Sequence, residues 1–462
     1  MLTLALLVVL AAAEVDQVAA PVFYAGNEEL RAYLMEAAEN NPALRAMHEE
    51  WLAALERIPQ ATSLDDPKLS FTYFLQSDTK DYGLGLMQEF PWFGTLRARG
   101  DMAAAEAEAA LQRLYAARNQ VFAEVKKAYF EYAYLDENLR ITESQEELLR
   151  YMEEVVRAKY AVGMAMEDEL LRIQMEQSVV QDRKQGLLQM RPALAAQLIT
   201  ALGREAAEPL DWPQSCALPP NPPSADVVMA RIQTANPELL AMDHMIESRG
   251  AAIRMARKMG RPEFGLEIGF ERMKPMAGMP KTTAVLDAAG AANNLVTGMN
   301  PGPVDALMNA NTLAMTRDNL STPAVEDDVM LSFSLSLPIW RKRVKAGIAE
   351  AQHKEAGASH DKRRMTLAME SEARMALFGV QDAVRRVSLY EDDLLQRARL
   401  TYESVQASYG VNAGASFLDV LESVRRLLDF DLEKAAAVRD LQNAAADLER
   451  LMGGPWVPAP AR

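Results

Sequence analysis

Residues Val329–Lys345 read VMLSFSLSLPIWRKRVK, and this stretch decides the predicted fold. Val329, Leu331, Phe333, Leu335 and Leu337 are apolar, and the serines at positions 332, 334 and 336 lie between the last four of them. A period of two places alternate side chains on opposite faces of a strand, so one face is apolar and the other is small and polar. Pro338 ends the strand because proline has no backbone N–H to donate. The pattern fits an amphipathic strand of an ordinary sheet, or a membrane β-barrel strand edged by an aromatic residue and cations.

Composition excludes several classes of function. The 462 residues carry a net charge of -16, so we expect no nucleic-acid partner, because no basic surface is available to release counterions from phosphates. The single cysteine, Cys216, rules out a disulfide within one chain, and the four histidines lack metal-ligand spacing. No phosphate-binding loop or nucleophile motif is present. We therefore predict no metal, no cofactor and no enzymatic activity.

The N-terminus has an apolar run, Leu2–Ala13, that ends in small residues. Twelve residues are too few to cross a bilayer as a helix, so we predict a signal peptide in residues 1–13. The chain has no other stretch approaching 18 apolar residues. If the protein enters a membrane elsewhere, we expect it to do so as a closed barrel.

The sequence is duplicated. The tetrapeptide NPAL at 41–44 recurs as NPEL at 236–239. The strand sequence that ends at Pro91 likewise resembles the one at 329–338 that ends at Pro338. Each half is predicted to contain a helix, two strands and two long helices. The expected boundaries are a first repeat at 14–212 (strands near 68–76 and 82–90, helical hairpin 95–203), a Pro-rich linker at 213–224, and a second repeat at 225–462 (strands near 263–271 and 328–337, loop insertion 273–323, helical hairpin 341–453).

The long helices carry packing seams. Apolar or small residues recur every seventh position at Val121, Ala128, Leu135, Thr142, Leu149 and Val156. This heptad spacing predicts a coiled coil. Four strands per chain are too few to close a membrane barrel, whereas three chains supply twelve.

These features together resemble the TolC-like outer-membrane efflux proteins. The turn sequences Tyr160–Met164 (YAVGM) and Tyr409–Leu421 (YGVNAGASFLDVL), the duplication and the strand-Pro-aromatic-basic junctions carry the resemblance. It implies an α+β membrane protein with tandem-duplicated helical hairpins and four strands per chain. A homotrimer would form a 12-stranded β-barrel that continues into a periplasmic α-helical barrel.

The resemblance also implies location and partners. We expect the protein in the outer membrane of a Gram-negative bacterium, in contact with outer-membrane lipid and extending into the periplasm. It would be a passive exit duct of a tripartite efflux or secretion system, coupled to a periplasmic adaptor (membrane fusion) protein and an inner-membrane pump. The alternative is a periplasmic coiled-coil structural or adaptor protein without a pore. Two hairpins with strands between them disfavour an adaptor, which would have a single hairpin.

The resemblance assigns residues to a periplasmic aperture. Asp419 and Glu422 match the family's acidic positions, Glu169 stands where relatives have an aspartate, and Tyr409 matches a latch tyrosine. Rings of three carboxylates would select cations and raise the carboxylate pKa values by mutual repulsion. Alternatively, Asp419 and Glu422 are solvated charges at a helix start, where acids are favoured. Ser416 departs from the family, because the best-known member has a latch arginine there.

Two further groups follow from the resemblance. The adaptor-contact hairpin tips are expected at Val162, Gly163, Met164, Ala413, Gly414 and Ala415, although glycine also suits a tight turn. The strand-to-helix junctions and membrane-interface anchors are Pro91, Trp92, Pro338, Trp340 and Arg341. The insertion 273–323 is rich in methionine, whose thioether suits Cu(I), but its Gly, Asn and Ala content is also typical of a surface loop.

Overall fold

The computed structural model of the chain describes residues 27–77, 79–204, 210–213, 218–219, 223–273, 327–410 and 414–455. The predicted signal peptide, Cys216, Ala413 and the insertion beyond Met273 lie outside these ranges. The chain divides into a helical unit (1–59, 101–251 and 352–462) and a strand unit (60–100 and 252–351).

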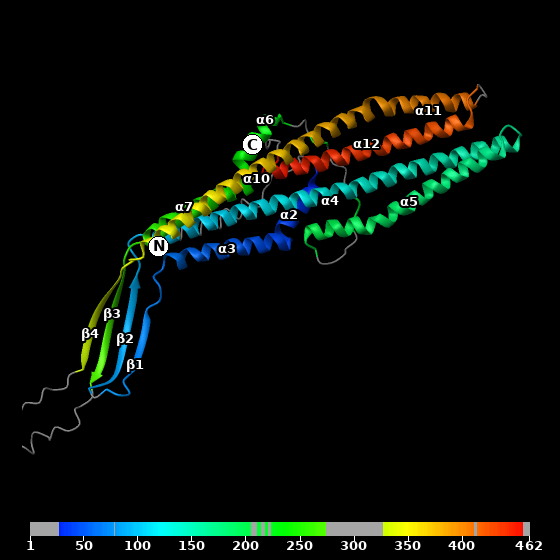
Figure 1. The fold of residues 1–462 in the computed structure, drawn as a ribbon. Helices are drawn as coiled ribbons and strands as arrows, with labels where there is room; N and C mark the ends of the chain where they lie inside the picture. The colour runs from blue at the N-terminus through cyan, green and yellow to red at the C-terminus, as the bar shows by residue number, and fades with distance from the viewer. Residues whose placement is uncertain are drawn as a thin grey trace, which may run out of the picture. The chain divides into compact units, whose positions relative to one another are not determined.

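The strand unit contains one antiparallel sheet with the order β1-β2-β3-β4 (Figure 1). Its strands are β1 Lys68–Tyr73, β2 Lys80–Phe90, β3 Glu263–Met273 and β4 Asp328–Ser336. The first strand is shorter than the expected 68–76, because the chain turns at residues 75 and 76 before β2 begins. Among the described residues, β1 and β4 each have one edge without a partner strand.

Strand register sorts the side chains onto two different faces. Leu69 pairs with Leu86, which pairs with Ile268, which pairs with Leu331. Because side chains alternate along each strand, this row and its neighbours make one face apolar across all four strands. Leu69 is 76% exposed and Leu331 is 72% exposed. Within one chain, therefore, no other element covers this apolar face.

The opposite face of the sheet carries mostly small or polar side chains. Its central row runs from Ser70 through Gly85 and Gly269 and ends at one apolar residue, Met330. Gly85 leaves room for the carboxylate of Glu267, because a Cβ at position 85 would lie 2.8 Å from Oε1 of that side chain. The same glycine accepts a 3.3 Å hydrogen bond on its carbonyl from the Ser70 hydroxyl. The four strands together thus have one apolar face, suited to lipid, and one mostly polar face, suited to water.

Long helices make up the rest of the described chain. The longest, α4, has 67 residues and spans about 100 Å at 1.5 Å per residue. The helices are α2 Glu28–Asn40, α3 Pro42–Thr62, α4 Thr95–Ala161, α5 Glu167–Leu202, α6 Ala225–Ala235, α7 Pro237–Lys258, α10 Arg341–Leu389, α11 Leu395–Gly410 and α12 Phe417–Leu451, with a π-helical turn at Tyr390–Leu394 between α10 and α11. None of the helices in the described ranges combines the length and apolar character that crossing a membrane requires.

The duplicated Asn-Pro sequences have the same structural role in both halves. Asn41 precedes α3, accepts a hydrogen bond from the Ala43 amide and donates one of 3.0 Å to the Ala201 carbonyl at the end of α5. Asn236 precedes α7 and donates one of 2.8 Å to the Leu451 carbonyl at the end of α12. Each asparagine thus caps its own helix and satisfies a terminal carbonyl of another.

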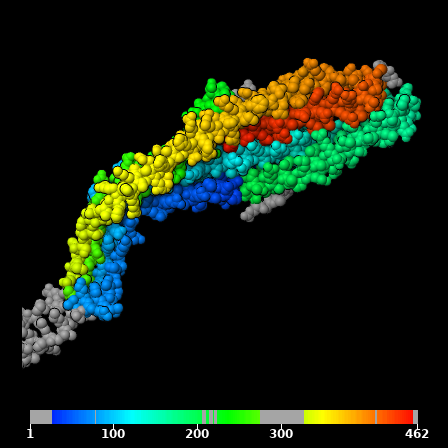
Figure 2. Space-filling view, in the orientation of Figure 1, coloured from blue at the N-terminus to red at the C-terminus, as the bar shows by residue number. Residues whose placement is uncertain are grey.

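Two equivalent hydrophobic cores, one in each repeat, hold the short helices α2 and α6 against the long helices. One packs Leu30 and Leu34 of α2 against α4 and the end of α5. The other packs Val228 and Ile232 of α6 against α10 and the end of α12. In the space-filling view (Figure 2), α12, in red, lies between α11, in orange, and α4, in cyan. The helical unit is therefore a row of helices in which α12 and α4 are central.

Candidate functional site at the ends of the helical hairpins

The first hairpin turns at Gly163, between α4 and α5. Met164 N–H donates to the Lys159 carbonyl at 2.8 Å and Gly163 N–H donates to the Tyr160 carbonyl at 3.0 Å, the two bonds of a Schellman motif. This motif needs a left-handed residue, and Gly163 has φ of +75°. Val162 and Met164 beside it are 69% and 67% exposed, so the turn presents apolar side chains to its surroundings.

The second hairpin turn also contains a left-handed glycine. Gly414 has φ of +92°, and a Cβ there would meet nothing within 4 Å. Helix α12 then begins after Ser416, whose side chain accepts from the Asp419 amide while the Asp419 carboxylate accepts from the Ser416 amide at 2.8 Å. This capping box satisfies two backbone donors at the start of α12.

The ends of the two hairpins are joined. Tyr409 at the end of α11 donates a 2.8 Å hydrogen bond from its hydroxyl to Oε2 of Glu169 at the start of α5. Lys159 at the end of α4 donates from Nζ to the Tyr409 carbonyl at 2.9 Å and lies 3.7 Å from the centre of the Tyr409 ring. Burial, reinforced by the hydrogen bond to Glu169 and its charge, raises the pKa of Tyr409. The phenol therefore stays protonated and able to donate.

An apolar cluster supports these polar contacts. Phe417, Val420 and Val424 of α12 pack with Val156 of α4 and Ile173 of α5. The Tyr409 and Phe417 rings lie 6.0 Å apart between centroids. Further from the turns, Arg425 of α12 pairs with Glu176 of α5. The hairpin ends thus pack together through one apolar cluster and a few polar contacts.

The predicted acidic residues of α12 lie outside this junction. Glu422 pairs with Arg426 on its own helix at 2.6 Å, and the Asp419 carboxylate accepts hydrogen bonds from Ser416. The hydrogen bonds from Ser416 lower the pKa of Asp419. The expected rise in carboxylate pKa depends on rings formed by three chains and stays a prediction for the trimer, whereas in the single chain a carboxylate that accepts bonds at a helix start is stabilised in its charged form.

Of the predicted aperture residues, the structure brings together Tyr409 and Glu169. Lys159 was not predicted from the sequence. A cation in the last turn of a long helix is nevertheless a recognisable signal, because it lies where the helix dipole is negative.

Among the described residues, no group of three His, Cys, Asp or Glu side chains is placed to hold a metal ion.

The predicted junction residues follow the ends of β2 and β4. The Trp92 ring lies 5.7 Å from that of Phe264, the second residue of β3. Trp340 is largely exposed and Arg341 begins α10. An aromatic residue and a cation therefore end the sheet on the side where the long helices begin, as at a boundary between lipid and water.

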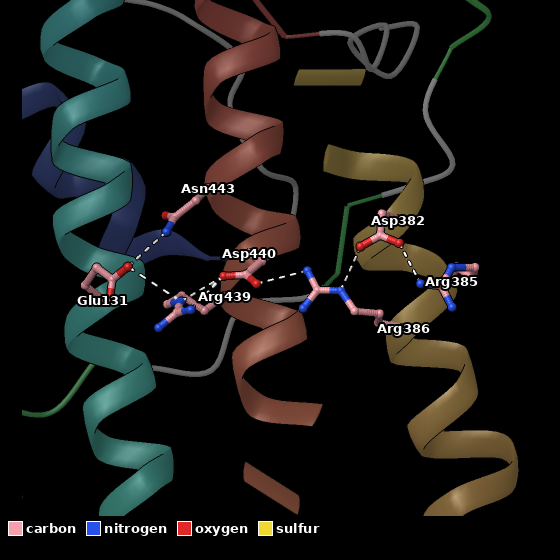
Figure 3. Close-up of polar contacts among 7 residues, drawn as sticks. All are labelled: Glu131, Asp382, Arg385, Arg386, Arg439, Asp440 and Asn443. Carbon is pink, nitrogen blue, oxygen red and sulfur yellow. Dashed lines mark hydrogen bonds and ion pairs between the residues drawn. The ribbon is translucent and has the colours of Figure 1, made fainter. Parts of the chain in front are cut away.

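A charge network links α4, α12 and α10 (Figure 3). Asp440 of α12 accepts from Arg439 at 2.7 Å and from Arg386 of α10 at 3.0 Å. Arg439 in turn lies 3.6 Å from Glu131 of α4, and Arg386 also bonds Asp382. Alternating charges thus connect α4, α12 and α10 in one chain of contacts.

Comparisons with known proteins agree with this architecture. A family model described as outer membrane efflux protein matches residues 33–204 and 228–454. No curated protein sequence matches the chain. The outer membrane protein VceC of Vibrio cholerae superposes with a TM-score of 0.69 at 17% identity, over 93% of this chain and 97% of that one.

Two further solved structures are similar. The open-state MtrE outer membrane channel of Neisseria gonorrhoeae has a TM-score of 0.69 at 16% identity, over 92% of this chain and 89% of its own. The CmeC outer membrane channel of Campylobacter jejuni has a TM-score of 0.68 at 15% identity, over 93% and 86%. At such identities, the likeness establishes the fold.

Proposed function

Because this chain belongs to the outer membrane efflux protein family, we propose that three copies of it form the exit duct of a tripartite export system. The protein lies in the outer membrane and extends into the periplasm, and members of its family are conduits rather than enzymes. The proposal adds the trimer, the pore and the coupling to a periplasmic adaptor and an inner-membrane pump.

The observation that carries the proposal is the uncovered sheet. Its apolar face is continuous across four strands, while β1 and β4 each have an edge unpaired in the described residues. Unpaired backbone groups are not tolerated in lipid, so the edges have to pair with other chains. Three chains give twelve strands, with the apolar rows toward lipid and the Ser70 and Ser334 side around the pore.

The hairpin ends support coupling to an adaptor. Val162, Met164 and the small residues Gly414 and Ala415 lie at the two tips, where another protein's helices could pack closely. Such contact would bring export energy from an inner-membrane pump, because no catalytic group is predicted in this chain. The Tyr409–Glu169 contact then serves as a releasable closure.

The pore also requires an entrance. We assign Asp419 and Glu422, with Glu169 and Tyr409, to the periplasmic aperture. Asp419 and Glu422 are three residues apart on α12, so both lie near one face of the helix. In a trimer they would contribute two rings of three carboxylates.

Cross-linking through the sheet edges tests the shared barrel. In a Cys216→Ser background, we would replace Ser70 on β1 and Ser332 on β4 with cysteine and oxidise whole cells. Covalent trimers are expected, because β1 of one chain meets β4 of the next. The matched control pairs Ser70→Cys with Gly269→Cys, since β3 has partners on both sides within one chain. A stable monomer in mild detergent without cross-links would instead support a periplasmic coiled-coil protein without a pore.

A further inference from the structure

Three helix ends come together where the sheet ends on the side of the long helices. A Cβ at Gly260, just after α7, would lie 2.6 Å from Cγ1 of Val344 in the first turn of α10. Lys258 at the end of α7 donates a 3.1 Å hydrogen bond to the carbonyl of Phe93, two residues before α4. The start of α4, the end of α7 and the start of α10 therefore meet at one level of the strand unit (Figure 1).

This level is strongly basic. Residues 92–100, 254–262 and 337–349 together contain ten Lys or Arg and no Asp or Glu, in a chain whose net charge is -16. We call these cations the basic collar; they are Arg97, Arg99, Arg254, Arg257, Lys258, Arg261, Arg341, Lys342, Arg343 and Lys345. So many charges of one sign in a few short segments of an acidic protein indicate a surface for an anionic partner.

Most of the basic collar is unpaired. Arg99 lies 3.9 Å from Asp65, and Lys258 donates to the Phe93 carbonyl. Among the described residues, seven collar cations form no ion pair within 4.0 Å, and all seven are exposed: Arg97, Arg257, Arg261, Arg341, Lys342, Arg343 and Lys345. These side chains are therefore available to a partner outside the chain.

The basic collar adjoins the apolar face of the sheet. Phe264 of β3 lies on that face, and the rings of Trp92 and Phe93 lie 5.7 and 5.8 Å from its ring. Phe93 is 76% exposed, and its carbonyl holds the ammonium of Lys258. Trp340, which is 72% exposed, directly precedes the four cations at the start of α10. Aromatic side chains followed by cations at the end of an apolar surface are typical of a membrane interface.

The acids at this end of the sheet lie on the other face. Glu89 of β2 and Glu263 of β3 belong to the polar face, because side chains alternate along each strand. Glu89 is also paired with Lys68 at 2.8 Å. An anion that approaches along the apolar face therefore meets the cations without these carboxylates.

We propose that the basic collar binds anionic phospholipid headgroups in the periplasmic leaflet of the outer membrane. The proposal rests on the proposed function, because it requires the apolar face of the sheet to lie in lipid. Acyl chains would pack against that face as far as Phe264, and phosphates would lie beyond Trp92 and Trp340, at the cations of α7 and α10. Clusters of basic residues next to a membrane segment attract anionic lipids, and arginine can donate two hydrogen bonds to one phosphate.

Tryptophan quenching by brominated lipids tests the proposal, because Trp92 and Trp340 lie within the collar segments. The full chain would be reconstituted into phosphatidylcholine vesicles that contain increasing fractions of brominated phosphatidylglycerol or, in parallel, brominated phosphatidylcholine. We expect phosphatidylglycerol to associate about fivefold more strongly or better, and this preference to disappear in about 0.5 M NaCl, since salt screens exposed charges. Equal quenching by the two lipids at low salt would overturn the proposal, and this comparison does not depend on the folding of any variant.

Variants locate the preference. One variant replaces three exposed collar cations on α10: Arg341→Gln, Lys342→Gln and Lys345→Gln. It should reduce the preference for phosphatidylglycerol to less than about twofold. The matched control removes three exposed cations further along the same helix and should keep the preference: Lys354→Gln, Arg363→Gln and Arg374→Gln. An equal reduction in the control would mean attraction by overall charge and would refute the collar.

Two other outcomes would also contradict the proposal. If the lipids show no preference, but isolated peptidoglycan retains the unmodified protein and not the collar variant, the basic collar binds the cell wall instead. Absence of quenching by either lipid would mean that the sheet does not enter the bilayer, which would refute the barrel as well. Quenching by both lipids without preference would refute the collar alone and leave the proposed duct intact.

Discussion

The hydroxyl of Tyr409 on α11 lies 2.8 Å from Oε2 of Glu169 on α5, so one hydrogen bond joins two hairpins whose residues are 240 positions apart. The Lys159 ammonium also lies over the Tyr409 ring and donates a hydrogen bond to the Tyr409 carbonyl. Three helix ends therefore meet at one tyrosine. If the duct opens by separating the hairpins, this contact has to break first.

Removing the Tyr409 hydroxyl should loosen the closure. A hydrogen bond to a charged carboxylate contributes about 1.5 kcal/mol or more, so Tyr409→Phe should increase the open population by roughly tenfold or more. Single-channel recordings in planar bilayers would show more frequent or larger openings. The control is Tyr160→Phe, because Tyr160 is an exposed tyrosine near the first turn. Identical recordings for Tyr409→Phe and the unmodified channel would refute the latch.

Substitutions at Gly163 separate turn geometry from adaptor contact. Its left-handed φ of +75° costs a leucine about 1–2 kcal/mol, whereas asparagine tolerates it. If the adaptor needs a small residue, Gly163→Leu and Gly163→Asn should both reduce export while the trimer stays in the membrane. Gly186→Leu, on the exposed surface of α5, is the control. Normal export by the asparagine variant alone would show that only the turn matters.

The two faces of β4 should differ in tolerance to charge. Leu331→Arg places a cation in the central apolar row, opposite Ile268, and should cost roughly 2–4 kcal/mol near the middle of the bilayer. Ser332→Arg, one residue later on the polar face, should cost much less. The amount of folded trimer in outer-membrane fractions measures the difference. Equal losses at the two positions would show that the assignment of the faces is wrong.

A buried ion pair between α4 and α12 should contribute more to the free energy of unfolding than the exposed ion pair next to it. Lys126 and Glu449 lie 2.5 Å apart with side chains 2% and 8% exposed. Lys126→Met leaves an unpaired buried carboxylate and should lower the free energy of unfolding by about 3–5 kcal/mol. Lys126→Met with Glu449→Leu should recover most of that loss.

The matched control for the buried pair is Lys127→Met. Lys127 and Asp447 are also 2.5 Å apart but partly exposed, so this change should cost less than about 1 kcal/mol. Chemical unfolding followed by circular dichroism compares the variants. Equal destabilisation by Lys126→Met and Lys127→Met would show that burial does not set the strength of these contacts.

Local patterns predicted the strands, the turns and the duplication. The alternation in Val329–Ser336 depends only on near neighbours, and the repeated Asn-Pro sequences mark the helix starts at Asn41 and Asn236. The resemblance to a family, rather than any pattern, assigned Tyr409 and Glu169 to the same aperture, and the hydrogen bond between them comes from the structure. No sequence signal joins residues so far apart.

Other features depend on how the helices cross. Gln145 looks like an ordinary polar residue of a long helix, yet it is buried in the folded chain. Lys126 and Glu449 meet although they are 323 positions apart in sequence. Heptad spacing predicts that a helix has a partner, but it does not identify which partner or at what height the two helices align.

The acidic residues of α12 provide the most demanding test of the proposed aperture. Asp419 accepts hydrogen bonds from Ser416, which lowers its pKa, so in the single chain it is a helix-capping charge. In a trimer, the same carboxylate and Glu422 would also ring a narrow passage. The two roles are compatible, and they predict different responses to mutation.

If the carboxylates ring the aperture, Asp419→Ala with Glu422→Ala should weaken cation selectivity and blunt block by multivalent cations added from the periplasmic side. Ser416→Ala removes the hydroxyl that caps α12 and keeps both charges, so it should leave selectivity intact. Glu433→Ala, an exposed charge further along α12, controls for general charge loss. Reversal potentials and block in planar bilayers measure all three. The ring of charges and the helix cap both use the Asp419 carboxylate. These residues therefore lie around the passage if the double variant loses selectivity while Ser416→Ala and Glu433→Ala keep it. Unchanged selectivity in the double variant would refute the assignment.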